Sequence, residues 1–405
     1  MNALRNLIDK IKPTFSEGGK LSMFRSVFDG FETFLFVPNE TSKPIGAQIH
    51  DAVDSKRIMI MVVIALIPAL LFGMYNIGYQ HFLSIGQLAT TGFFPMFWYG
   101  FLSVLPKIIV AYAVGLGIEF TVAQWKGEEI HEGFLVTGFL IPMIVPVDCP
   151  LWIMAIATAF AVIFAKEIFG GTGMNILNVA LITRVFLFFA YPTKMSGDSV
   201  WIRTDDVCGI GEGQLVDGFT GATPLGQLAT ATGSTINLTD AAGNSISILD
   251  AILGFIPGSI AETSVIAIAL GAILLLVTRI ASWKTMLSVF LGGAFMGFIF
   301  NVSGIDTAAA NLPWYYHLVL GGFAFGAVFM ATDPVTSSRT ETGKWIYGFL
   351  IGVMAIVIRV LNPGYPEGMM LAILLMNLFA PLIDYYVVQR NVSKRAKRIA
   401  KSVKQ

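Results

Sequence analysis

Apolar runs of about 20 residues recur along most of the chain and constrain its fold more than any other feature. An α-helix of about 20 residues crosses roughly 30 Å of hydrocarbon and satisfies its backbone hydrogen bonds internally. Charged residues make up only 13% of the 405 positions, about half the share in soluble globular proteins. The alternating apolar and polar segments of an outer-membrane barrel are absent from the sequence. The sequence therefore predicts an all-α polytopic membrane protein.

The apolar runs predict about ten transmembrane helices. We expect these spans at 57–78, 99–123, 133–149, 151–169, 174–192, 262–281, 285–303, 314–332, 345–362 and 367–388. A long polar segment, 193–261, separates the fifth span from the sixth, and it is too long to be a simple connection.

Positive charge gathers where the expected bundle begins and ends. The tail 389–405 holds seven lysines and arginines and no acid, and Lys56 and Arg57 open the first span. Because basic residues flank spans on the cytoplasmic side, both the leader 1–56 and the tail are expected in the cytoplasm. Alternation of the spans then places 193–261 outside, in the periplasm. A basic tail can also bind nucleic acid, but beside a last membrane span the topological interpretation is preferred, and no nucleic-acid partner is expected.

The last three spans of each half of the chain look alike. Each half contains a glycine-spaced helix, a Pro/Asp break (Pro146–Asp148 and Asp333–Pro334) and a glycine-rich turn that opens the final span. Five spans per half is an odd number, so the second copy enters the membrane from the opposite side. The pattern predicts two inverted five-helix repeats, 57–192 and 262–388, an arrangement similar to that of urea and ammonium channels. The alternative is that glycine and proline are simply common in membrane helices.

The sequence shows no metal site and no dinucleotide fingerprint. Cys149 and Cys208 are too few for a disulfide framework or a four-thiolate site, and the four histidines lack ligand spacing. No G-x-G-x-x-G follows an expected strand, so any oxidation of NADH must occur on a partner chain.

The outer segment contains the run DGFTGATPL. The small residues Gly221 and Ala222 are expected to leave the Thr223 hydroxyl approachable by a bulky group, and Pro224 fixes the direction of the chain just after it. On chemistry alone this run is more often an ordinary surface loop.

A resemblance changes this interpretation. Residues Asp217 to Thr223 closely resemble the flavinylation motif D-x-x-[ST]-G-A-[TS], whose last hydroxyl residue is joined to FMN by a phosphoester. The matching positions are Asp217, Thr220, Gly221, Ala222 and Thr223. Nearly the whole chain is similar to the B subunits of Na⁺-translocating NADH:quinone reductases, in blocks that include HEGFLVTG, AKEIFGGTG, HLVLGGFAFG, MATDPV and NPGYPEGMMLAILLMNLFAPLID.

This resemblance implies a redox subunit of a bacterial inner-membrane complex with six subunits. Electrons from NADH pass through a partner that carries FAD and an iron–sulfur centre, and through a second subunit with covalent FMN. In this chain they pass from covalent FMN on Thr223 to non-covalent riboflavin and then to ubiquinone, coupled to Na⁺ export. A flavin transferase that acts outside the cytoplasm attaches the FMN, in agreement with the expected topology.

The resemblance also implies that riboflavin lies near Asn175, Asn178 and Asp333. The two asparagines are three residues apart, and we expect them on one helix face, where amide groups can meet an isoalloxazine edge. The alternative is that the asparagines bond a neighbouring helix and that Asp333 caps one.

The quinone region of the family corresponds to Gly115 and Glu119, one helical turn apart, although Leu116 replaces the usual second glycine. Glu119 is either a functional acid within a span or one whose side chain reaches the interface. Asp384 resembles a family position on the Na⁺ path, and here a Na⁺ ligand and a helix-packing acid are equally consistent with the sequence.

Other classes of function stay open at this stage. The D subunit of the Rnf electron-transport complex resembles this chain but has a shorter N-terminus, so the long leader favours the sodium-pumping reductase. A solute channel of the same architecture and a structural anchor without a cofactor are the remaining alternatives.

Overall fold

The computed structural model describes residues 2–16, 19, 21, 28, 32, 55–127, 133–197, 200–210, 221–231, 233 and 235–402. Within these ranges every regular element is a helix, and extended pairing is limited to two isolated bridges, Val207 with Ile210 and Thr239 with Ser245. The all-α prediction is confirmed. Asp217 and Thr220 lie outside the described residues, as does most of the leader 1–56.

Six helices in the described part of the chain are long and apolar enough to cross a membrane. They are α3 (Ser55–Ser84), α4 (Phe93–Lys126), α6 (Leu151–Ala161) with its continuation, α11 (Trp283–Ser303), α15 (Glu341–Leu361) and α16 (Met369–Ser402). The α6 helix continues through a π-helical turn, η2 (Val162–Lys166), and a 3-10 turn, η3 (Glu167–Phe169). Each of the six corresponds to one expected span, which agrees with a multi-pass membrane protein.

The other four expected spans are short or interrupted. Spans 133–149, 174–192 and 262–281 contain the apolar helices α5 (Phe134–Met143), α7 (Val179–Ala190) and α10 (Val265–Val277). Span 314–332 is divided into α13 (Trp314–Val319), α14 (Phe323–Phe325) and η5 (Gly326–Met330). The prediction of one continuous helix over each of these four ranges is wrong. In the last range Gly321 and Gly322 interrupt the helix with φ of +64° and +68°, a left-handed conformation that glycine adopts at little cost.

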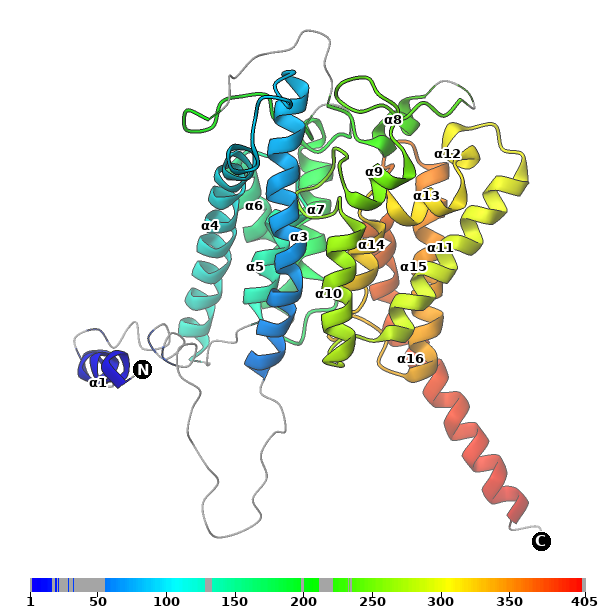
Figure 1. Ribbon diagram of the computed structural model, residues 1–405. Helices are drawn as coiled ribbons and strands as arrows, with labels where there is room; N and C mark the ends of the chain where they lie inside the picture. Colours follow the sequence, from blue (N-terminus) through cyan, green and yellow to red (C-terminus); the bar gives the residue numbers. More distant parts are fainter. Residues whose placement is uncertain are drawn as a thin grey trace.

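Shorter helices lie outside the main bundle: α1 (Asn2–Phe15), η4 (Pro192–Lys194), α8 (Pro224–Thr230), α9 (Ile248–Leu253) and α12 (Ala308–Asn311). Figure 1 shows α8, α9 and α12 together at one end of the bundle. The start of α3 and the projecting end of α16 lie at the opposite end (Figure 1). The segment that carries Thr223 is therefore separated from the basic tail by the length of the bundle.

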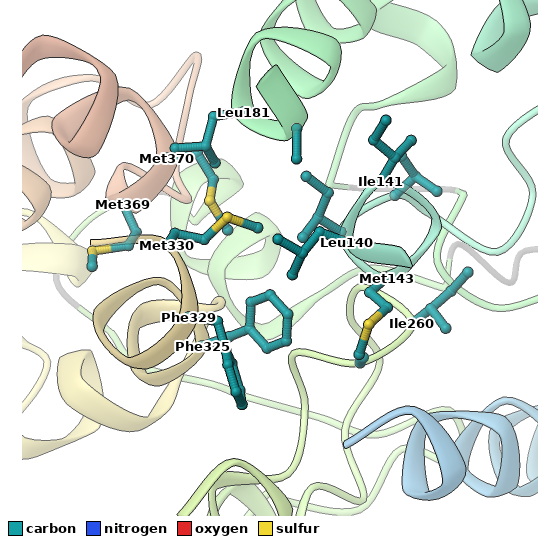
Figure 2. Packing of buried hydrophobic residues seen from close by; sticks show 14 of the residues in the cluster. Leu140, Ile141, Met143, Leu181, Ile260, Phe325, Phe329, Met330, Met369 and Met370 are labelled. Carbon is teal, nitrogen blue, oxygen red and sulfur yellow. The ribbon is translucent and has the colours of Figure 1, made fainter. Parts of the chain in front are cut away.

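Interrupted elements from both halves of the chain meet in the middle of the bundle. Helix α7 packs against α5 and α16, and α16 packs against η5. Figure 2 shows the buried side chains where these elements meet, among them Leu140, Met143, Leu181, Phe325 and Phe329. The centre between the two ends is thus filled by apolar groups.

The outer faces of the long helices are apolar as well. Exposed large side chains include Ile64 and Leu71 on α3, Ile109 on α4, and Phe298 and Val302 on α11. A water-soluble monomer rarely exposes so extensive an apolar surface, so these faces fit contact with lipid.

Candidate functional site

A cavity of about 130 Å³ lies among the ends of several helices, near the start of α3 and the end of α10. Its polar wall is formed by Lys166, Thr172, Asn175, Asn178, Thr332 and Asp333. Its apolar wall includes Ile58, Met59, Val62, Leu140, Leu275 and Phe329. The cavity therefore combines segments from both halves of the chain.

The structure brings Asn178 and Asp333 together, although they are 155 positions apart. The Asn178 amide donates to Asp333 Oδ2 at 3.3 Å. Asp333 also accepts hydrogen bonds from the Val335 N–H at 3.1 Å and from the Thr336 hydroxyl at 2.9 Å. These donors hold the carboxylate in place, and they compensate its charge in a largely enclosed site.

The prediction that Asn175 and Asn178 share one helix face is wrong. Helix α7 begins only at Val179, and Asn178 caps it by accepting the Leu181 N–H at 3.2 Å. Asn175 lies in the preceding turn, where its amide donates to the Leu177 carbonyl at 3.1 Å. Asparagine is a favoured cap because its side-chain oxygen reaches a free N–H of the first turn. Both asparagines nevertheless line the cavity.

The cavity is close in size to a single six-membered ring. Its volume of about 130 Å³ is slightly below the roughly 150 Å³ of a protein cavity that holds benzene. The amide groups of the asparagines match the carbonyl and N–H groups of a pyrimidine-type edge. The remaining rings of an isoalloxazine would lie beyond this volume, whereas a quinone headgroup is itself one ring.

Glu119 is buried and ion-paired with Lys166, whose side chain is equally buried. Glu119 therefore lies inside the protein beside a cation, and both alternatives left by the sequence stay predictions. Lys166 is the last residue of the π-helical turn η2, a distortion that often marks functional sites. Gly115 shares the buried face of α4 with Glu119, as expected, and the ring of Phe134 covers it.

Thr223 differs from the open hydroxyl that the sequence predicts. Only 8% of the residue is exposed, and its hydroxyl accepts the Gly226 N–H at 3.0 Å as the cap of α8. The cause is the short helix itself, because Leu225 and Leu228 pack into a small apolar cluster and draw Thr223 inward. The Thr223 N–H donates to the Gly197 carbonyl at 2.8 Å. Gly221 and Ala222 precede it, and Gly221 has a φ of +57°.

A second cavity, of about 20 Å³, lies beside Thr223 and has room for about one water molecule. It is bordered by Ser259, Glu262, Gly322 and Glu367 as well as Thr223. The candidate attachment residue is therefore adjacent to a buried carboxylate, Glu262, and a partly exposed one, Glu367.

Sequence reasoning missed the charge cluster behind this small cavity. Arg184 is completely buried and pairs with Glu262 at 3.3 Å and with Glu367, and it also donates to the Ile144 carbonyl. Arg359 donates to the carbonyls of His317 at 2.5 Å and Leu320 at 2.9 Å. A signal was present, since each arginine lies within an expected apolar span, where charge is costly and often functional.

Asp384 organises the chain that leads into α15. It accepts the hydroxyls of Ser338 and Thr340 at 2.6 Å each, and the N–H groups of Arg339 at 2.7 Å and Thr340 at 3.0 Å. This geometry is that of a helix-packing acid. A role on the Na⁺ path stays a prediction.

The described residues thus form a polytopic membrane protein with a mixed polar and apolar cavity at one end and a buried charge cluster at the other. The chain belongs to the NQR2, RnfD, RnfE family, whose sequence model matches residues 44–393.

Several relatives match almost end to end. The chain is 45% identical over 417 residues to the B subunit of the Na⁺-translocating NADH-quinone reductase of Chromohalobacter salexigens, covering 98% of this chain and 97% of the relative. It is 44% identical over 423 residues to the protein of the same name from Klebsiella pneumoniae, covering 98% and 99%. The corresponding B subunit of Pseudomonas aeruginosa is 44% identical over 422 residues, with the same coverage.

Proposed function

We propose that this chain is the membrane-embedded B subunit of a Na⁺-translocating NADH:quinone reductase. The observation that carries the proposal is 44–45% identity to proteins of that name over 98% of the chain. The family also contains Rnf subunits, but the relatives named as B subunits of the reductase match the full length, including the leader. The chain is thus a component of a translocase that joins NADH oxidation to quinone reduction and Na⁺ transport.

The proposed cofactors are FMN on Thr223 and riboflavin in the cavity bounded by Asn175, Asn178 and Asp333, with ubiquinone as the acceptor near Gly115 and Glu119. Bound flavins supply carriers that accept and release electrons one or two at a time. Thr223 acts as a tether through its hydroxyl and has no acid–base task. Asn178 and Asp333 would orient the polar edge of a ring, and the apolar wall would exclude water from it. The motif with Thr223 and the donor set of the cavity support this assignment.

The proposed chain architecture is ten membrane crossings in two inverted repeats, 57–192 and 262–388. Support comes from the interrupted third element of each half, α5 and α13–η5, and from the opposite placement of α8 and the tail (Figure 1). With both termini in the cytoplasm, Thr223 faces the periplasm of a bacterial inner membrane, where a flavin transferase acts.

The proposed partners are the other subunits of a six-subunit complex. They include a second subunit with covalent FMN and a subunit that oxidises NADH with FAD and an iron–sulfur centre. Asp384 is the proposed residue of the Na⁺ path. A cation there would replace donors from Ser338 and Thr340, and carboxylate and hydroxyl oxygens are suitable ligands for it.

Covalent flavin is tested on denatured chain from the native host. After separation on a gel, the wild-type band and that of Thr235→Ala, an exposed threonine outside the motif, are expected to fluoresce as flavin, and Thr223→Ala is expected to be dark. A dark wild-type band would exclude covalent FMN, and a fluorescent Thr223→Ala band would move the site to another residue.

A further inference from the structure

The buried pair of Lys166 and Glu119 connects two regions that the family resemblance treats separately. Glu119 lies on α4 in the proposed quinone region, and Lys166 lies at the end of η2 in the wall of the cavity. The exposed fractions of the two side chains are 5% for Lys166 and 6% for Glu119. Each charge therefore depends on the other, because water cannot stabilise either one.

The ammonium group of Lys166 has two close neighbours among the described contacts, Glu119 and the ring of Phe134. Its Nζ lies 5.8 Å from the centre of the Phe134 ring, which fills the space over Gly115. Glu119 is not among the residues that border the cavity, so it lies behind the lysine as seen from the cavity. Lys166 thus borders the cavity, while its ammonium group lies against Glu119 and the Phe134 ring, neither of which borders it.

The opposite charge in the wall, Asp333, is stabilised by neutral hydrogen-bond donors. Its oxygens accept hydrogen bonds from Asn178, Val335 and Thr336, and the structure records no ion pair between Asp333 and Lys166 among the described residues. A ring held between these walls would therefore feel Lys166 as the cation of the wall, opposed by Asp333 in the wall and by Glu119 behind the lysine.

We propose that the Lys166–Glu119 pair sets the reduction potential of the non-covalent flavin held in this cavity. This inference rests on the function proposed above. The pair takes up no electron: with the cofactors bound, electrons would reach the ring from the covalent flavin and leave it to quinone, and the pair would respond only to the negative charge that the ring gains. An ammonium group favours the more negative, reduced form in a site of low dielectric constant, and Glu119 weakens that effect.

The proposal predicts two shifts of opposite sign in the midpoint potential of the non-covalent flavin. Glu119→Gln removes the attenuating charge with little change in shape and, in titrations at low pH, where Lys166 stays protonated without its partner, should raise the midpoint potential of the non-covalent flavin. Removal of the ammonium group, by Lys166→Gln within the Glu119→Gln chain, should lower the potential again relative to Glu119→Gln alone. Each step is expected to change the ratio of reduced to oxidised flavin at least tenfold, which is about 59 mV for a one-electron couple.

The experiment is a spectroelectrochemical titration of the purified complex carrying these variants. The neutral double variant avoids a lone buried charge, and replacing both members of a buried pair is usually tolerated. Lys166→Arg keeps the charge and should retain a potential close to the wild-type value. Lys126→Gln is the matched control. Lys126 pairs at 3.6 Å with Glu167, the residue that follows Lys166, and the side chain of Lys126 is more exposed than that of Lys166. It should leave the potential unchanged.

The outcomes separate this inference from the function on which it rests. A wild-type complex without a second, non-covalent flavin would count against the proposed function. If that flavin is present and the two steps leave its potential unchanged or shift it in one direction, the role of the pair is overturned. The same holds if a chain with Glu119→Gln retains no flavin at all, since the pair would then be structural.

Discussion

At the scale of single residues, the buried charges of this chain differ in how they are compensated. Arg184 meets two carboxylates and a carbonyl, whereas Arg359 is surrounded by main-chain carbonyls. Transfer of a charge out of water is costly, so every such group needs close partners of opposite charge or polarity. Glu262 and Glu367 both depend on Arg184 in this way. The arginine therefore joins segments from different parts of the chain.

Arg184→Met is expected to destabilise the protein by about 3–5 kcal/mol, because it leaves two carboxylates without their cation in a buried site. The measurement is thermal and denaturant unfolding in detergent. Lys284→Gln is the matched control: Lys284 pairs with Glu341, a side chain that is 64% exposed, so the loss of this pair should change the stability far less than Arg184→Met.

A chain with Glu262→Gln and Glu367→Gln added to Arg184→Met should recover part of the lost stability, since no lone charge is left. Equal stability of Arg184→Met and Lys284→Gln would show that the cluster contributes nothing net.

At the scale of elements, the long helices could be predicted and the interruptions could not. The bounds of the expected spans 285–303 and 345–362 differ from those of α11 and α15 by at most a few residues, because apolar length alone defines them. Helices such as α5 and α7 are also mostly apolar, and hydropathy does not reveal where a backbone turns. Their ends depend on a cap such as Asn178 and on glycine conformations that only the packed structure selects.

Gly322→Ala tests the interruption between α13 and α14. Alanine at a φ of +68° costs about 1–2 kcal/mol, and its Cβ would also lie 2.7–3.0 Å from the carboxylate atoms of Glu262. Gly304→Ala is the control, since Gly304 has a φ of +71° but no neighbour within 4 Å of an added Cβ. Gly322→Ala should lower the melting temperature of the purified protein more than Gly304→Ala. Equal losses would mean that Glu262 moves aside freely.

At the scale of the whole molecule, the candidate site could be predicted only in pieces. The resemblance named Asn178 and Asp333 together, and the structure brings them into contact. The pairing of Lys166 with Glu119 joins positions 47 apart through the packing of η2 on α4, and no local pattern encodes it. The burial of Thr223 likewise depends on where α8 packs. The residue types within one segment could thus be interpreted from the sequence, whereas contacts between segments could be seen only in the folded structure.

The orientation of the whole molecule is testable with its own cysteines. Cys208 is exposed in the segment expected outside the membrane, and Cys149 is buried. A maleimide that does not cross membranes should therefore label Cys208 in intact spheroplasts and leave Cys149 unmodified. A cysteine introduced on the exposed tail, Ser393→Cys in a Cys208→Ser chain, should react only after the cells are opened. Labelling is read by mass spectrometry of the purified chain. Reaction at Ser393→Cys in intact cells, with Cys208 protected, would invert the molecule in the membrane and place Thr223 on the cytoplasmic side, away from the proposed transferase.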